Sequence, residues 1–158
     1  MKTSSFPTFS FLALLCTTTV LSSPSYRDSV RRDPGPHPPF PFKTLNRTAG
    51  PPPEDTELHT GDITWFNVSL GACGWMNDGY AQDVVALSYK LMGNQSWGNP
   101  YCGRTITVSY KGKYIQPMVV DKCADCEDPD NIDLSVQAFS ELADLGVGRD
   151  KATWWFNN

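Results

Sequence analysis

The sequence predicts a small, mainly β domain, a barrel of about six short strands with one or two short helices, stapled by disulfides. Three observations lead to this prediction: short β-branched and aromatic segments between Gly- and Asn-rich stretches, one clearly amphipathic helical segment, and an even number of cysteines in the folded part. The chain of 158 residues is long enough for about one domain. A unit of about 100 residues buries only about two thirds of its unfolded surface, so the disulfides should contribute to its stability.

Residues 1–22 have the outline of a secretory signal peptide. Lys2 precedes an apolar run over residues 9–15, and small residues follow at Ser22 and Ser23. The run is too short for a spanning helix, and no later segment is long and apolar enough. We therefore expect a secreted, extracellular protein that does not bind a membrane.

Residues 23–59 are predicted to be a pro-segment and a Pro-rich linker. Arg31-Arg32 is either a cleavage site for a processing protease or a solvated pair, and the sequence leaves both alternatives open. "PGPHPPFPF" and "AGPPPED" favour extended chain and cannot pack a core. The barrel domain is therefore expected over residues 60–158.

Strand-like segments follow from residue 61 onward, beginning with the β-branched and aromatic "DITWFNV". "DVVALSYKLMG" is compatible with a strand or with a helical turn ending at Gly93. "RTITVSY" and "YIQPMVVD" are predicted to form a hairpin, in which Pro117 implies an edge or a bulge. "NIDL" and "KATWWF" complete the set, and alternation places one of Trp154 and Trp155 in the core and the other outward.

"SVQAFSELADLG" is the one clear helix. Ser135 can cap its start and Gly146 can end it. Its apolar side chains, which share one face, are Val136, Phe139, Leu142 and Ala143.

Four cysteines remain once Cys16 leaves with the signal peptide, and an even number in a small secreted chain predicts disulfides. Three pairings are compatible with the sequence, and we favour Cys73–Cys102 with Cys123–Cys126. Three glycosylation sequons begin at Asn46, Asn67 and Asn94.

The charge of the chain argues against some classes of partner. The net charge is −4 overall, and residues 60–158 hold twelve acidic residues against seven Lys or Arg. Nucleic acids and anionic membranes require clustered basic charge. Neutral polysaccharide, basic protein surfaces and small molecules remain, and we expect a monomer without a cofactor.

The stretch "VVDKCADCEDPDNIDLS", residues 119–135, holds six acidic residues and one C-x-x-C. A structural zinc site built on a C-x-x-C needs a second pair of ligands. The two histidines, His37 and His59, lie in the predicted linker and do not supply that pair. A calcium loop needs a turn glycine, which is lacking, and Pro129 interrupts the oxygen-bearing residues. Redox catalysis is disfavoured because acidic neighbours raise the pKa of a thiol. The sequence therefore predicts a structural disulfide and no metal.

Asp133 is the candidate acid of this stretch. On a strand, Ile132 and Leu134 point to one face and Asp133 to the other. A carboxyl group beside aromatic side chains can have a raised pKa and act as an acid. The alternative is that Asp133 caps a turn or accepts backbone N–H bonds near the helix start.

"GDITWFNVSLGACGW", "NPYCG", "MVVDKCADC", "IDLS" and "ATWWF" together resemble the double-psi β-barrel of expansins, barwin-type plant defence proteins, kiwellins and bacterial RlpA-like proteins. The most similar members are small secreted fungal proteins with a single barrel. The resemblance covers about residues 60–157. It implies a six-stranded double-psi β-barrel, and its motifs are specific to the fold but not to one activity.

The resemblance to expansins implies a groove that binds cell-wall carbohydrate without hydrolysis. The expansin Thr and two Asp residues correspond to Thr64, Asp121 and Asp133, and aromatic side chains can stack on sugar rings. In place of the expansin "HFD" motif this chain has Asn131-Ile132-Asp133. The groove residues implied are Thr64, Trp65, Trp75, Tyr80, Asp121 and Asp133.

Two other functions remain open. Single-barrel proteins of this kind include protein-binding effectors and cysteine-protease inhibitors, for which we expect a protruding hydrophobic loop in 75–80, 95–101 or 125–131. A lytic, glycan-cleaving enzyme would use Asp133 as its acid. Ordinary hydrolysis needs a second carboxylate across the groove, for which the candidates are Asp62, Asp78 and Asp83.

Overall fold

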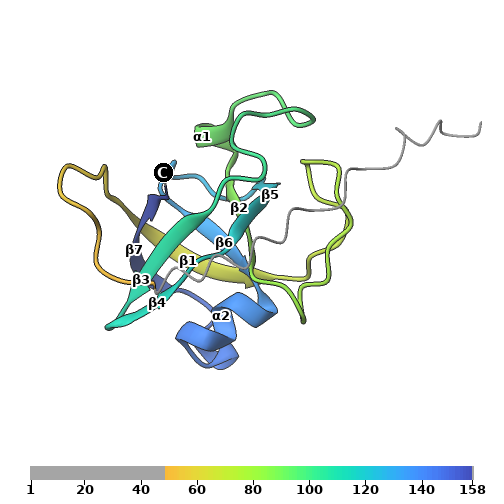
Figure 1. Cartoon of the computed structure of the whole chain (residues 1–158). Coiled ribbons are helices and arrows are strands. Elements are labelled where there is room, and N and C mark those ends of the chain that lie inside the picture. The colour runs from red at the N-terminus through yellow and green to blue at the C-terminus, as the bar shows by residue number, and fades with distance from the viewer. Residues whose placement is uncertain (1–48, 158) are drawn as a thin grey trace, which may run out of the picture. The chain divides into compact units, whose positions relative to one another are not determined.

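The computed structural model describes residues 49–157. The predicted signal peptide, Arg31-Arg32 and the sequon at Asn46 lie outside them. One sheet contains all seven strands in the order β4-β3-β7-β1-β6-β2-β5 (Figure 1). The elements are β1 (His59–Phe66), β2 (Val84–Ser88), α1 (Tyr89–Met92), β3 (Ile106–Tyr110), β4 (Lys113–Ile115), β5 (Met118–Cys123), β6 (Ile132–Ser135), α2 (Val136–Leu142), the 3₁₀ turn η1 (Leu145–Val147) and β7 (Asp150–Phe156).

The sheet curls until β5 meets the start of β3. Val119 N donates to Arg104 O at 2.8 Å, and Ile106 N donates to Pro117 O at 3.1 Å. The predicted mainly β barrel with two short helices is thus confirmed. It has seven strands because the predicted segment 114–121 is divided at Pro117, which has no N–H to donate to a ladder.

The structure settles the ambiguity of segment 83–93 and corrects the predicted end of α2. The ambiguous segment 83–93 is both a strand and a helix, since Ser88 ends β2 and its hydroxyl accepts from Lys90 N at the start of α1. The expectation that Gly146 ends α2 is wrong, because the helix ends at Leu142. Lys113 Nζ donates to the carbonyl oxygens of Glu141 and Leu142, which satisfies two of the acceptors exposed at this end.

The core is built from alternate strand residues and from α2. Phe139 of α2 and Trp154 of β7 are fully buried, and the His59 ring stacks on Trp154 with a centroid distance of 4.0 Å. Trp154 belongs to the core and Trp155 points to the other face of the sheet, as alternation predicts. Trp155 is nevertheless only 3% exposed, and the Tyr114 ring packs against it at a centroid distance of 6.4 Å.

Both favoured disulfides are present, Cys73–Cys102 and Cys123–Cys126. The helices within residues 49–157 are too short to cross a membrane.

Candidate functional site

Four neighbouring strands place three of the predicted groove residues in one row. In the parallel pair β1–β6, Thr64 lies opposite Asp133, and β2 places Ala86 opposite both Asp133 and Asp121. Residues in one row of a sheet point to the same face. The row therefore runs Thr64, Asp133, Ala86, Asp121 across β1, β6, β2 and β5.

A groove of about 590 Å³ opens over the first half of this row. Its floor includes Thr64 and Asp133, one wall is the Cys123–Cys126 disulfide, and the other is the loop 147–149. Thr64 Oγ1 donates a hydrogen bond of 2.6 Å to Asp133 Oδ1. The arrangement presents a carboxyl group and a hydroxyl group to a ligand.

Burial raises the pKa of Asp133 above its ordinary value. The hydrogen bond from Thr64 and the charge of Arg149 act in the opposite direction, and the carboxylates of Asp121 and Asp125 add to the rise. Asp133 is therefore suited to hold a proton.

Asp62 is a second groove carboxylate, and its pKa is shifted in the opposite direction to that of Asp133. It stands two residues before Thr64 and forms ion pairs with Lys151 at 2.9 Å and with Arg149 at 3.1 Å. The hydrogen bonds from Lys151 and Arg149 hold the pKa of Asp62 below its ordinary value. Asp62 lines the groove, whereas Asp78 and Asp83 do not.

Trp65 supplies the aromatic surface of the groove. Its side chain is 37% exposed, and its indole Nε1 donates to Leu145 O at 3.0 Å. This bond fixes the ring against the loop that forms the wall. Sequence reasoning missed this wall, although glycines at 146 and 148 mark a turn on either side of Val147.

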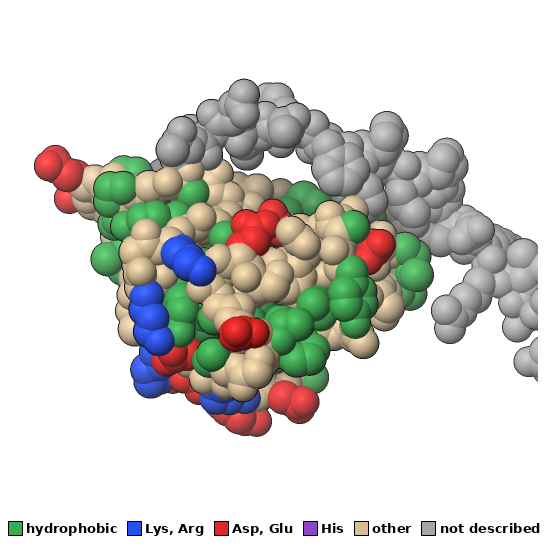
Figure 2. All heavy atoms as spheres, turned by 90° about the horizontal axis from the view of Figure 1, so that it is seen from below, with side chains coloured by type: hydrophobic (Ala, Val, Ile, Leu, Met, Phe, Trp, Pro, Cys, Tyr) green, Lys and Arg blue, Asp and Glu red, His purple; other side chains and the backbone are tan. Residues whose placement is uncertain are grey.

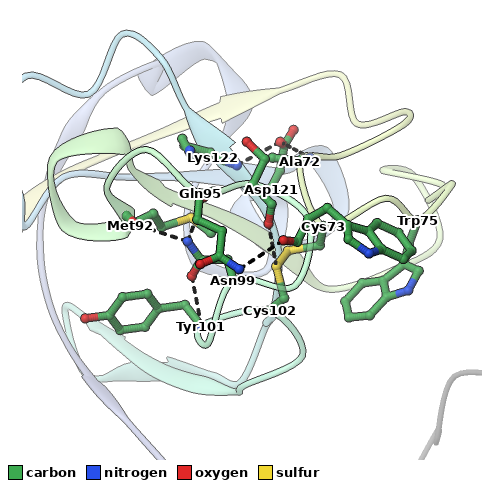
Figure 3. The surroundings of a disulfide bond; sticks show 12 residues. Ala72, Cys73, Trp75, Met92, Gln95, Asn99, Tyr101, Cys102, Asp121 and Lys122 are labelled. Carbon is green, nitrogen blue, oxygen red and sulfur yellow. Dashed lines mark hydrogen bonds between the residues drawn. A yellow bond between two sulfur atoms is a disulfide. The ribbon is translucent and has the colours of Figure 1, made fainter.

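The other three predicted groove residues lie elsewhere. Trp75 is partly buried and packs against the core beside the Cys73–Cys102 disulfide, as Figure 3 shows. Tyr80 is 66% exposed but lies outside the groove. Asp121 also lies outside the groove lining, because its Oδ1 accepts from the backbone N of Ala72 at 2.6 Å and of Lys122 at 2.7 Å.

A second surface is formed by two loops that the Cys73–Cys102 disulfide joins. Leu70 and Met76 are partners in an isolated antiparallel bridge and are 55% and 68% exposed. Trp97 belongs to the second loop and is 57% exposed. Its ring packs against Gly74 of the first loop, where an added Cβ would stand 2.0 Å from the Trp97 ring. We call Leu70, Met76 and Trp97 the apolar loop face. Hydrophobic side chains also gather beside acidic ones on the face drawn in Figure 2, where the basic side chains lie mainly along one edge.

The two described sequons flank this surface. Asn67 and Asn94 are both exposed, three residues before Leu70 and Trp97 respectively. Within residues 49–157, no group of three or more His, Cys, Asp or Glu side chains is arranged to hold a metal ion.

Comparison with known proteins gives the following relatives. No protein-family model matches the chain. The papain inhibitor of Streptomyces mobaraensis is 37% identical over 117 residues, which are 70% of this chain and 81% of that protein. An Asp f 7 allergen homologue of Arthroderma benhamiae is 46% identical over 83 residues, 52% of this chain. The chain spans only 28% and 36% of the lengths of this allergen homologue and of the Aspergillus fumigatus allergen.

Solved structures agree on the fold. The Streptomyces papain inhibitor superposes with a TM-score of 0.60 over 65% of this chain and 96% of its own. The expansin of Clavibacter michiganensis superposes with a TM-score of 0.55 at 22% identity, over 65% of this chain and 51% of its own, and a variant of it has been solved with cellohexaose. The expansin comparison shows the fold alone.

Proposed function

This chain belongs to the family of the Streptomyces papain inhibitor, and from this premise we propose that it is a secreted inhibitor of papain-type cysteine proteases. The observation that carries the proposal is the apolar loop face. Exposed apolar patches on small proteins mark sites of protein association, and Trp is enriched among the residues that dominate binding energy.

The loops are held ready for a partner. The disulfide joins the loop of Met76 to the loop of Trp97, so little conformational entropy is lost when both contact a protease. All four cysteines within residues 49–157 are paired. This part of the chain therefore has no free thiol for a mixed disulfide with the catalytic cysteine, and the mode of inhibition that we propose is non-covalent occlusion of the active-site cleft.

The double substitution Leu70→Ser/Met76→Ser is expected to raise the inhibition constant for papain by about 100-fold, because two exposed apolar anchors are lost. The full chain, secreted from a eukaryotic host, is titrated against papain with a fluorogenic peptide substrate. Tyr80→Ser is the matched control, since Tyr80 is equally exposed but outside the apolar loop face. Inhibition that is absent in the wild type, or unchanged in the double variant, contradicts the proposal.

A second candidate function is binding of neutral cell-wall polysaccharide in the groove, without hydrolysis. It is favoured by the exposed Trp65 ring beside the Thr64–Asp133 pair, since a fixed aromatic ring can cover a sugar face while the polar groups bond its hydroxyls. This function uses other residues than the apolar loop face, so the two are separable by mutation.

Asp133→Asn is expected to weaken retention on insoluble cellulose or chitin by about tenfold, because a charge-assisted hydrogen bond becomes a neutral one. Retention is measured by pull-down, and released sugars are assayed in the same tubes. Sugar release by the wild type that disappears in Asp133→Asn contradicts non-hydrolytic binding and assigns a glycan-cleaving reaction instead. Absence of retention on both polymers removes this second function.

We do not expect unfolding of Asp133→Asn to cause its weaker retention on polysaccharide. Because the pKa of Asp133 is raised above 3.8, the folded state holds this proton more tightly than the unfolded chain does. Stability is therefore lost as pH rises from 3.8 through the folded pKa. Removing the charge should leave Asp133→Asn at least as stable as the wild type at pH 7, with no gain below pH 3.8, and thermal unfolding at both pH values checks this.

A further inference from the structure

We propose that Asp121 is a positioning residue that holds the apolar loop face against the barrel. This inference rests on the proposed inhibition of papain-type proteases. The resemblance to expansins predicts Asp121 as a groove residue, but its carboxylate faces the backbone of the loop that carries Leu70 and Met76. Figure 3 draws Asp121 with its bonds to Ala72 and Lys122.

The loop lies closely on β5 at three consecutive residues. An added Cβ at Gly71 would stand 2.3 Å from Val120 O. Ala72 N donates to Asp121 Oδ1 at 2.6 Å, and Cys73 N donates to Val120 O at 3.2 Å. The bond from Ala72 thus ties the backbone of the loop to a side chain of β5.

Asp121 is separated from the groove by the packing of its row. Two strand spacings, about 10 Å, lie between Asp121 and Asp133. Ala86 stands between them and is only 2% exposed, because Cys123, Cys126 and Phe66 pack over it. The disulfide therefore blocks a ligand that lies over Asp133 from contacting Asp121.

The role requires an acceptor oxygen and not a charge, because both partners of Asp121 Oδ1 are backbone N–H groups. Asparagine keeps an Oδ1 acceptor at the same place, whereas alanine leaves the Ala72 N–H unsatisfied. A residue that binds a ligand through its carboxylate charge would lose function in both substitutions. Comparison of Asp121→Asn with Asp121→Ala therefore separates positioning from charge.

The test measures inhibition of papain together with amide hydrogen exchange in the full chain. Asp121→Ala is expected to raise the inhibition constant about tenfold or more and to speed exchange of the Ala72 amide by a similar factor. Asp121→Asn is expected to stay within about threefold of the wild type in both measurements. Both Asp121 variants should be retained on cellulose or chitin as strongly as the wild type, whereas Asp133→Asn should be retained more weakly.

The outcomes distinguish this inference from the proposed function. If the wild type does not inhibit papain, the proposed function fails, and the exchange rate of the Ala72 amide alone decides whether Asp121 holds the loop. If the wild type inhibits but Asp121→Asn loses as much inhibition as Asp121→Ala, the charge is required and positioning is overturned. Should Asp121→Ala fail to fold, Asp121→Asn remains decisive, since full inhibition supports positioning and lost inhibition overturns it.

Discussion

Replacing Cys73 and Cys102 by serine is expected to lower the free energy of unfolding by about 3–4 kcal/mol and to abolish inhibition of papain. The bridge closes a loop with a sequence separation of 29 residues, and the chain-entropy estimate for such a loop is of this size. The same bridge joins the loops of Met76 and Trp97. Without it the apolar loop face must be ordered during binding, at a cost to affinity. Urea unfolding and titration against papain measure the two effects.

The second disulfide provides the matched control. Cys123–Cys126 spans a sequence separation of 3, so the same estimate gives only about 2 kcal/mol for its loss. It lines the groove, and neither of its cysteines belongs to the two loops that carry the apolar loop face. Serine at both positions should therefore weaken retention on polysaccharide and spare inhibition of papain. Equal loss of inhibition in the two double variants would show that the effect is general destabilisation.

The fold was predictable because strand residues here alternate in the usual way. Ile132 and Leu134 are fully buried, and Asp133 points to the other face, as the two-residue period requires. The strand break at Pro117 also has a local cause. Alternation predicts which face of the sheet a side chain points to, but not whether another strand covers that face. The Tyr114 ring of β4 packs against Trp155 of β7, so Trp155 is buried although it points away from the core.

The site was predictable only in part, for a related reason. The resemblance implied that Thr64 and Asp133 share a groove, and they meet because β1 and β6 are parallel neighbours. The bond from Ala72 to Asp121 joins residues 49 positions apart, and no pattern in either segment indicates it. Leu70 was missed for the same reason, since its exposure depends on how the loop lies on β5.

Gly71→Ala is expected to destabilise the protein by about 1–3 kcal/mol and to raise the inhibition constant for papain by about 100-fold. An added Cβ would stand 2.3 Å from Val120 O, a backbone atom that cannot move without shifting β5. The loop must therefore lift, which breaks the bonds of Ala72 and Cys73 to β5 and separates Leu70 and Met76 from their support. Thermal unfolding and papain titration measure the effects.

Gly146→Ala is the control, because nothing lies within 4 Å of an added Cβ there. The same chemical change should then be neutral or slightly stabilising through the unfolded chain. The pair also tests where the activity lies, since Gly146 belongs to the turn beside Trp65 and Gly71 to the loop on β5. If Gly71→Ala is destabilised as expected and still inhibits papain with the inhibition constant of the wild type, the apolar loop face does not bind the protease.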